Sequence, residues 1–265
     1  MPRSALLNVM VGAALKAGRT LTRDFGEVES LQVSIKGPAD FVSAADRRAE
    51  KIVIDELSRA RPTYGFLTEE TGEIAGKDRA HRWLVDPLDG TTNFLHGIPI
   101  FSVSIALERD GEIVAGVVYN PVMNEMFTAE KGTGAYFNDR RQRVAGRTEL
   151  AAAVIATGVP HLGRPAHDEF LRELGALMNR VAGIRRCGSA ALDLAWLAAG
   201  RFDGFWEHAL SPWDVAAGIL LVREAGGIVT DVEGADGALT GRSILAANPR
   251  LHGQLRAALA AARTG

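Results

Sequence analysis

The sequence predicts a layered α/β fold, because the pattern of helices and strands changes once along the chain. Over residues 1–145, helical segments come before a series of strand segments joined by short turns, which is typical of an antiparallel sheet. Over residues 146–265, strand and helix segments alternate, which is typical of helices packed on a sheet. The polar stretch 140–149 separates the two patterns. We therefore expect two lobes, 1–145 and 146–265, that form one compact unit.

The first lobe is expected to begin with two amphipathic helices. Ser43 is the predicted N-cap of the second helix, with Asp46 in its first turn, an amphipathic run over 49–57, and Pro62 as its end. Between the helices, residues 35–40 are predicted to form a turn-rich loop. The first helix is indicated by an apolar stripe, which argues against a secretory signal peptide. The stripe consists of Leu7, Val11, Ala14, Gly18, Leu21 and Phe25.

Strands are expected to fill the rest of the first lobe and to alternate with helices in the second. The turn Arg109–Gly111 is predicted to join two neighbouring strands as a hairpin. The expected strands of the first lobe are residues 64–67, 82–85, 100–107, 112–119 and 126–129. The expected strands of the second lobe are 154–157, 184–186, 202–207 and 228–231, and its expected helices are 167–178, 190–199, 215–224 and 257–262.

The composition is that of an ordinary soluble globular protein, with 47% apolar and 23% charged residues among 265. A formal net charge of −2 gives no electrostatic reason to expect nucleic acid or an anionic membrane as the main partner. Cys187 is the single cysteine, so no intramolecular disulfide can form, which fits a reducing compartment. No segment has the roughly 18 unbroken apolar residues of a membrane span. We therefore expect a cytoplasmic protein.

The segment Trp83–Phe94 carries the strongest chemical signal. A short apolar run ends in Asp86 and Asp89, and carboxylates at a strand end are suitable oxygen ligands for Mg²⁺. The turn Gly90–Thr92 follows at once and exposes backbone N–H groups that can hold an oxyanion. Pro87 disfavours helix at the residue before it, so we expect the chain to leave the sheet there. One loop thus combines a metal site with a phosphate site, which indicates metal-assisted phosphoryl chemistry.

Two further acidic positions have both a simple and a functional interpretation. Glu69 and Glu70 follow a predicted strand, and an isolated pair of this kind is usually a solvated loop. Because they end a strand as Asp86 and Asp89 do, these carboxylates could converge. Asp214 begins a predicted helix, where a carboxylate is favoured by the helix dipole. It could also point into a cleft, although alone it favours the simpler interpretation.

Residues Gly188-Ser189-Ala190 and Glu207 also have two interpretations. They are either a helix start and an exposed acid, or a wall of small residues and an acceptor for substrate hydroxyls. Cys187 is more often a small buried residue than a nucleophile in such a position. The six histidines lack metal-ligand spacing, and the chain has no Gly-x-Ser-x-Gly elbow and no Walker-type phosphate loop. Hydrolysis of nucleoside triphosphates is therefore not expected.

Together these motifs resemble those of a known family. Asp86–Phe94 and Trp213–Gly218, with Glu224–Gly227 after them, resemble the two signatures of the inositol monophosphatase family. The run Gly188–Ala195 is similar to that of its bacterial members of the SuhB type. The likeness covers essentially the whole chain in the family's order. One departure is Thr68, which stands where the family usually has glycine before the first Glu.

The resemblance implies an αβαβα sandwich, a homodimer, and a phosphorylated polyol such as inositol monophosphate as substrate. It also implies two or three Mg²⁺ ions and inhibition by Li⁺. Glu69 is preferred to Glu70 because the family's ligand is the first Glu of its pair. The implied metal ligands are Glu69, Asp86, Asp89, Asp214 and the carbonyl of Leu88. The implied phosphate-binding residues are Gly90, Thr91 and Thr92, and the implied polyol-binding residues are Gly188, Ser189, Ala190, Glu207 and Asp89.

The resemblance also implies the catalytic residues Glu69, Thr91 and Asp46, with Thr91 and Asp46 hydrogen-bonded beside an attacking water. A phosphate monoester is dianionic, so its charge must be neutralised before attack, and Mg²⁺ also lowers the pKa of a bound water. Asp86 is best placed to bridge two ions, and a second ion near Asp89 and Asp214 would stabilise the leaving alkoxide. We therefore expect direct in-line attack without a phospho-enzyme.

Alternatives remain open. The same chemistry could act on fructose 1,6-bisphosphate, histidinol phosphate, 3′-phosphoadenosine phosphate or NADP. A bisphosphate needs an added cationic pocket, which Arg185 and Arg186 could supply, although an interface or surface role is favoured for them. A different class is a regulatory partner of RNA polymerase or transcription factors, for which the sequence has no motif. Metal binding is expected to release protons and to order the loops Lys36–Asp40 and Glu69–Gly76.

Overall fold

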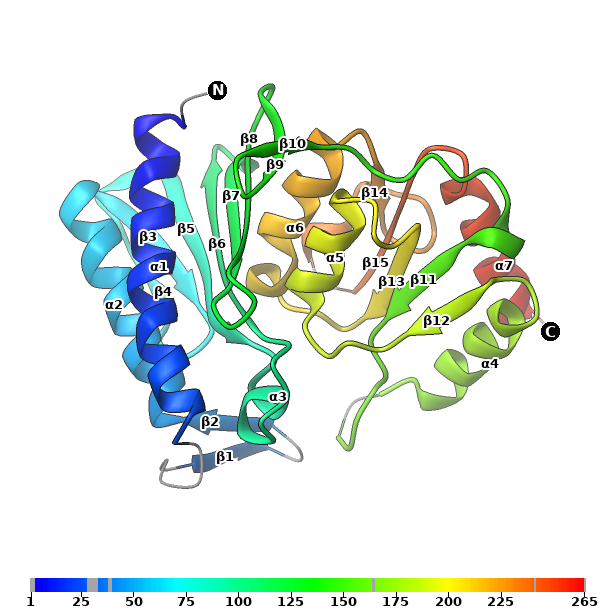
Figure 1. Ribbon diagram of the computed structural model, residues 1–265, viewed down its shortest axis with the longest axis horizontal. Helices are drawn as coiled ribbons and strands as arrows, with labels where there is room; N and C mark the ends of the chain where they lie inside the picture. Colours follow the sequence, from blue (N-terminus) through cyan, green and yellow to red (C-terminus); the bar gives the residue numbers. More distant parts are fainter. Residues whose placement is uncertain (1–2, 28–32, 38–39, 164, 241, 265) are drawn as a thin grey trace.

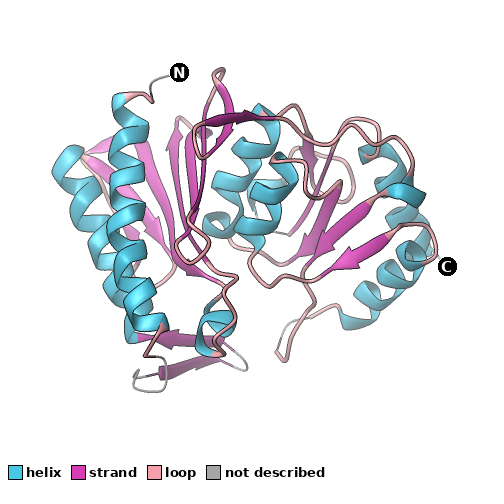
Figure 2. Cartoon of the chain, viewed as in Figure 1, coloured by secondary structure: helices cyan, strands magenta, loops and turns pink. Residues whose placement is uncertain are grey.

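Helices and sheets alternate in layers in the computed structural model, which describes residues 3–27, 33–37, 40–163, 165–240 and 242–264. Two helices cover the outer face of the first sheet, two lie between the sheets, and two cover the outer face of the second sheet (Figures 1 and 2). This order confirms the αβαβα sandwich. From the first layer to the last, the helices are α1 (Ala5–Phe25) and α2 (Ala44–Ala60), α5 (Ala190–Ala198) and α6 (Pro212–Glu224), and α4 (His167–Met178) and α7 (His252–Thr264).

The two N-terminal helices form as the sequence predicts. The N–H of Leu7 donates to the side chain of the N-cap Ser4 at 3.1 Å, and α1 buries its apolar stripe except for Phe25, which is half-buried. Ser43 caps α2 and forms a capping box with Asp46, so the first turn of α2 is fixed by side chains. This cap also fixes where Asp46 points.

The loop expected over residues 35–40 was wrong. The backbone forms two antiparallel strands, β1 (Val33–Gly37) and β2 (Asp40–Ser43). The β-branched residues Val33, Ile35 and Val42 favour extended backbone, and in the described segments 33–37 and 40–43 this preference outweighs the turn signal. Residues 38–39 and the side chains of Lys36 and Asp40 lie outside the described part of the chain.

The first sheet has the strand order β10-β9-β8-β7-β6-β5-β3-β4. Its neighbouring strands are antiparallel except β3 and β5, which are parallel. The predicted hairpin turn joins β6 to β7. In chain order the strands are β3 (Tyr64–Thr68), β4 (Gly72–Ile74), β5 (Asp78–Asp89), β6 (Ser102–Arg109), β7 (Glu112–Asn120), β8 (Glu125–Glu130), β9 (Gly134–Phe137) and β10 (Arg140–Gln142).

The strand β5 does not leave the sheet at Asp86, and that expectation was wrong. Asp86 lies opposite Ser104 on β6 and Asp89 lies opposite Ser102, so β5 has one residue more than β6 between these pairs. Such a bulge accommodates Pro87, which has no N–H to donate to a neighbouring strand. The bulge bends the strand end that carries both aspartates.

The middle layer is almost entirely buried. All nine residues of α5 are buried, and α6 is buried from Val215 to Val222, because each helix contacts both its partner and a sheet. Gly218 lies against Leu194 so closely that a Cβ would clash with this side chain. The two helices therefore approach closely, and their N-terminal ends lie at the same side of the molecule.

The second sheet has the strand order β12-β11-β13-β15-β14. The strand β15 was not predicted, because all five of its residues are buried and it lacks the alternation that marks a strand in sequence. Among the described helices, none is long and apolar enough to span a bilayer. The strands are β11 (Val154–Thr157), β12 (Gly183–Arg185), β13 (Gly204–His208), β14 (Ile228–Thr230) and β15 (Ser243–Ala247); the short helices are α3 (Thr91–Leu95) and 3-10 turns at Leu150–Ala152 and Ala238–Thr240.

Candidate active site

A cavity of about 330 Å³ opens where the end of β5, the start of α3, the starts of α5 and α6, and β13 meet. It collects residues that are far apart in sequence and come from both sheets. Asp46 and Arg185 do not line it. The sequence-predicted residues that line it are Glu69, Asp86, Leu88, Asp89, Gly90, Thr91, Thr92, Arg186, Gly188, Ser189, Ala190, Glu207 and Asp214.

The strand β3 directs Glu69, and not Glu70, into the cavity. Glu69 lines it, and its carboxyl group is hydrogen-bonded to that of Asp86. Glu70 instead lines a separate depression, together with residues of α2. The N–H of Glu69 donates to the carbonyl of Val85 on β5, 3.2 Å away, which fixes the turn beside Asp86.

The bulged end of β5 holds Asp86 inside the molecule. Its side chain is 2% exposed, and its Oδ1 accepts a hydrogen bond from the N–H of Leu88 at 2.9 Å. The carbonyl of Leu88 in turn accepts a hydrogen bond from Thr91 Oγ1 at 3.1 Å. The local backbone therefore orients the carboxylate, the carbonyl and the hydroxyl within one short segment.

Asp214 satisfies both interpretations of a helix-start carboxylate. Its Oδ2 accepts a hydrogen bond from the N–H of Ser211 at 2.8 Å, which completes a capping box on α6. Asp214 also lines the cavity. Ser104 of β6 donates to the carbonyl of Trp213 at 3.3 Å and ties this helix start to the first sheet. The cap thus positions the carboxylate for the cavity.

The pKa values show how concentrated the negative charge is. Burial, and next the charges of Glu69, Asp89 and Asp214, raise the pKa of Asp86 well above its usual value. Burial and the charge of Asp89 likewise raise the pKa of Asp214. Burial raises the pKa of Asp89 to about 6, although hydrogen bonds from Ser189 and Ala191 oppose it. Buried and half-buried carboxylates that lie this close together favour a bound cation.

Asp46 lies behind Thr91 and does not face the cavity. It is fully buried, and its Oδ1 is 3.1 Å from Thr91 Oγ1, which donates to it. Burial raises the pKa of Asp46, while hydrogen bonds from Ser43 and Thr91 lower it. A hydroxyl proton directed at Asp46 or at the Leu88 carbonyl leaves a lone pair of Thr91 Oγ1 for the cavity.

Gly90 makes the turn after Asp89 possible. Its φ is 99°, a conformation that side chains other than glycine's rarely adopt. A Cβ there would lie 2.9 Å from the carbonyl oxygen of Ile100 and 3.2 Å from that of Gly188. Only glycine lets these segments meet, and the first backbone N–H groups of α3 then lie at the cavity.

The wall Gly188-Ser189-Ala190 is bonded directly to Asp89. Ser189 caps α5, and its hydroxyl donates to Asp89 Oδ2 at 2.6 Å. The N–H of Ala191 donates to the same oxygen at 2.8 Å. Asn93 Nδ2 donates to the carbonyl of Cys187 at 2.8 Å. The wall and the acidic cluster are therefore one structure.

Glu207 reaches the cavity because residue 158 is a glycine. A Cβ on Gly158 would overlap the carboxylate of Glu207. The neighbours Trp206 and His208 face the other side of β13, where both are hydrogen-bonded to Glu173. Sequence reasoning missed Gly158, and the only signal was a glycine directly after a buried strand. The other cavity residues it missed are Val159, His161, Asp193, Leu210, Ser211 and Trp213.

The residues around Cys187 divide into separate roles. Cys187 is only half-buried, and burial raises the pKa of its thiol to about 12, so it stays a thiol. Arg186 lines the cavity, whereas the exposed Arg185 bonds to the carbonyl of Ile184. The two arginines therefore do not form one pocket. Asp193 is 1% exposed, and burial raises its pKa.

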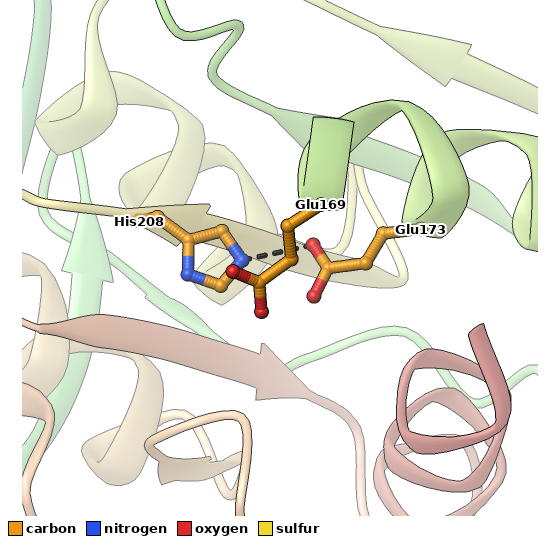
Figure 3. A group of neighbouring side chains, drawn as sticks. All are labelled: Glu169, Glu173 and His208. Carbon is orange, nitrogen blue, oxygen red and sulfur yellow. Dashed lines mark hydrogen bonds and ion pairs between the residues drawn. The ribbon is translucent and has the colours of Figure 1, made fainter. Parts of the chain in front are cut away.

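A second acidic group lies on the opposite side of β13 and is shown in Figure 3. Ligand atoms of Glu169, Glu173 and His208 lie within 4.8 Å of one another, which is compatible with a metal ion. However, Arg263 donates to Glu173 Oε1 through Nε at 2.9 Å and Nη2 at 2.8 Å, and pairs with Glu169 at 3.0 Å. A metal would have to displace this guanidinium.

Comparisons with known proteins agree with this geometry. The sequence model of the inositol monophosphatase family matches residues 3–264. An inositol-1-monophosphatase of Mesorhizobium japonicum is 65% identical over 248 residues, which are 94% of this chain and 93% of its own. The Nus factor SuhB of Escherichia coli K12 is 45% identical over 246 residues, 93% of this chain and 92% of its own. The crystal structure of the extragenic suppressor protein SuhB from Bartonella henselae is similar with a TM-score of 0.95 and 63% identity, covering 97% of this chain and 98% of that one.

Proposed function

This chain belongs to the inositol monophosphatase family and is a phosphatase, and we propose that it is a Mg²⁺-dependent phosphomonoesterase acting on myo-inositol 1-phosphate or a related polyol phosphate. The observation that carries the proposal is the meeting of Glu69, Asp86, Asp89 and Asp214 in one cavity beside the Gly90 turn. Such an arrangement places a cation site next to a phosphate site.

The chemistry of the donor set fits Mg²⁺. The candidate ligands offer only oxygen atoms, from four carboxylates and the Leu88 carbonyl, and hard divalent cations prefer such donors. Bound Mg²⁺ would neutralise the charge of a phosphate dianion and lower the pKa of a bound water. We propose two or three ions, which Glu69, Asp86, Asp89, Asp214 and the Leu88 carbonyl would hold, with Asp86 a shared ligand because its carboxyl group interacts with Glu69, Asp89 and Asp214.

The protein's own groups orient the reactants. Thr91 directs its hydroxyl proton to Asp46 or to the Leu88 carbonyl, so its oxygen and the Glu69 carboxylate can accept protons from the attacking water. Backbone N–H groups of Gly90, Thr91 and Thr92 hold the phosphate. The reaction is then a direct in-line attack, and a substrate with a chiral phosphate should give inversion at phosphorus. Retention would contradict this mechanism.

The polyol is expected to bind on the far side of the cavity from the phosphate. Gly188–Ala190 and Asp89 form one wall, and the Glu207 carboxylate accepts hydrogen bonds from hydroxyl groups. Because the cavity takes residues from both 1–145 and 146–265, we propose that the two lobes act as one catalytic unit. The single cysteine of the sequence, Cys187, leaves no intramolecular disulfide to form, which supports a location in the cytoplasm.

A substrate panel tests this proposal. We expect kcat/KM to be highest for myo-inositol 1-phosphate or another polyol monophosphate, to require Mg²⁺, and to fall with Li⁺. The alternative substrates in the panel are fructose 1,6-bisphosphate, histidinol phosphate, 3′-phosphoadenosine phosphate and NADP. They are included because Arg186 lines the cavity and would bind a second anionic group of the substrate. Activity that is unchanged by a chelator would contradict the metal dependence.

A second candidate function is regulatory. The 45% identity to a protein named Nus factor SuhB supports a role as a partner of the transcription machinery, through RNA polymerase or transcription factors. An Asp86→Asn variant separates the two functions. Loss of phosphatase activity with retention of a cellular role would favour the regulatory function, whereas joint loss would favour catalysis. We also propose a homodimer, which light scattering of the purified chain would measure.

A further inference from the structure

Glu69 is carried by a short turn whose shape decides where its carboxylate lies. Thr68 of β3 pairs with Gly72 of β4, so residues 69–71 make a tight connection. The N–H of Glu69 is bonded to β5, as described above, which fixes the start of this turn. The rest of the turn is held from another direction.

Glu50 of α2 supplies this second anchor. The N–H of Glu70 donates to Glu50 Oε2 at 2.9 Å, and the hydroxyl of Thr71 donates to Glu50 Oε1. Glu50 is 2% exposed, so both bonds are shielded from water. Donors left buried without an acceptor cost free energy. The turn should therefore depend strongly on Glu50.

The same helix face supports the other side of the site. Asp46 and Glu50 are four residues apart on α2, so they point in a similar direction. Asp46 accepts a hydrogen bond from Thr91, and Glu50 holds the turn that carries Glu69. One face of α2 thus contacts both the segment that carries Thr91 and the turn that carries Glu69. These are the two residues proposed to orient the attacking water.

We infer that Glu50 is a positioning residue, which holds Glu69 against Asp86 for cation binding through its bonds to Glu70 and Thr71. The inference rests on the proposed function, in which Glu69 and Asp86 are metal ligands. Glu50 does not line the active-site cavity, but the depression behind the turn, so it acts only through its neighbours. Removing such a support of a metal ligand typically weakens metal binding about 10–100-fold.

The test measures Mg²⁺ binding to the full chain by calorimetry, without substrate. We expect Glu50→Gln, which nearly preserves the side chain's shape, to raise the Kd for Mg²⁺ about tenfold or more. Its kcat should recover at high Mg²⁺, and its KM for substrate at saturating Mg²⁺ should stay close to that of the wild type. Thr71→Val keeps Glu50 and removes one bond, so it should raise the Kd by a smaller factor even if Glu50→Gln does not fold.

Asp24→Asn is the matched control. Asp24 is 4% exposed and accepts a hydrogen bond from Arg48 of α2 at 2.6 Å, so it supports the same helix away from the turn. This variant should lower Tm but leave the Kd for Mg²⁺ unchanged. This inference alone would be overturned if Glu50→Gln had the same Kd for Mg²⁺ as the wild type. It would also be overturned if Asp24→Asn raised this Kd as much as Glu50→Gln does. Failure of the wild-type chain to bind Mg²⁺ would overturn the proposed function together with it.

Discussion

The molecule contains two acidic groups that differ in how their charge is balanced. In the group of Glu169, Glu173 and His208, Arg263 bonds to both glutamates. Burial would raise the pKa of Glu173, but hydrogen bonds from His208 and Arg263 hold it below its usual value. In the active-site cavity, burial and neighbouring carboxylates raise the pKa of Asp86 instead.

The difference teaches how to distinguish a structural acidic cluster from a functional one. In a cluster that contains its own guanidinium, the arginine balances the negative charge, and the ion pairs stabilise the fold. A cluster in which neighbouring carboxylates raise the pKa values of members such as Asp86 and Asp214 is expected to need a cation from solution. Proximity of carboxylates alone does not separate the two cases.

The largest expected effect comes from removing one carboxylate from each group. Asp89→Asn should lower kcat by about 1000-fold or more, because it removes a proposed metal ligand. The matched variant Glu169→Gln should leave kcat within about threefold of the wild type. Steady-state kinetics at saturating Mg²⁺ compares the two. Comparable losses in both variants would show that the charge balance does not mark the functional group.

The second effect separates orientation of water from metal binding. Thr91→Val keeps the shape of the side chain but removes the hydroxyl between Asp46 and the cavity. We expect kcat to fall about 100-fold, as for loss of a group that orients a proton transfer, with the Mg²⁺ affinity nearly unchanged. If the Mg²⁺ affinity falls with kcat, Thr91 holds the metal site and does not act on the water.

The third effect tests the complete cluster directly. Arg263→Ala leaves Glu173 buried without its guanidinium, which should lower the free energy of unfolding by about 2 kcal/mol after allowing for the partial exposure of Arg263. Without the guanidinium, Glu169, Glu173 and His208 should bind a divalent cation. Mn²⁺ should therefore raise the Tm of Arg263→Ala more than that of the double variant Glu169→Gln/Arg263→Ala. No difference between these variants would mean that Arg263 does not occupy a metal site.

The smallest effect is on the pH dependence of stability without metal. Asp86, Asp89 and Asp214 have raised pKa values, so above about pH 4 the folded chain holds more protons than the unfolded chain. The contribution of Asp89 to stability therefore falls as pH rises from about 4 through 6, and those of Asp86 and Asp214 fall as pH rises through their own raised pKa values. Mg²⁺ displaces these protons, so it should raise Tm more at pH 8 than at pH 5. An equal rise at both pH values would contradict the raised pKa values.

The lowered pKa of Glu173 has the opposite sign. Its contribution to stability is present at neutral pH and is lost as pH falls, because protonation breaks its bonds to Arg263 and His208. Comparing Glu173→Gln with the wild type in the presence of Mg²⁺ isolates this part. The variant should be less stable than the wild type at pH 7, and this difference should shrink toward low pH.

Much of the site was predictable because its residues are close in sequence. Asp86, Asp89 and the Gly90 turn form one motif, and their carboxylate and N–H groups define the chemistry locally. Asp214 was visible as a helix start, but its second role depends on where α6 packs. The choice of Glu69 over Glu70 came from the family resemblance. In the structure the two side chains point in different directions because successive side chains at a strand end alternate between the two faces of the sheet.

The rest depended on contacts that no local pattern encodes. Gly158 matters only because the Glu207 carboxylate occupies the place of its missing Cβ. In the sequence, Glu50 is indistinguishable from any other polar residue of an amphipathic helix. Only the fold places it behind the turn that carries Glu69. The strand β15 was missed because a strand buried on both faces has no alternation. These features depend on tertiary contacts, which local patterns in a single sequence do not reveal.

The most direct test of the central claim is a crystal structure of the wild-type chain soaked in Mn²⁺, with anomalous scattering used to locate the ions. The account predicts anomalous peaks among Glu69, Asp86, Asp89 and Asp214, and no peak at Glu169, Glu173 and His208. Peaks at the second group, or none in the cavity at millimolar Mn²⁺, would contradict the claim that the cavity carboxylates are the ones that need a cation.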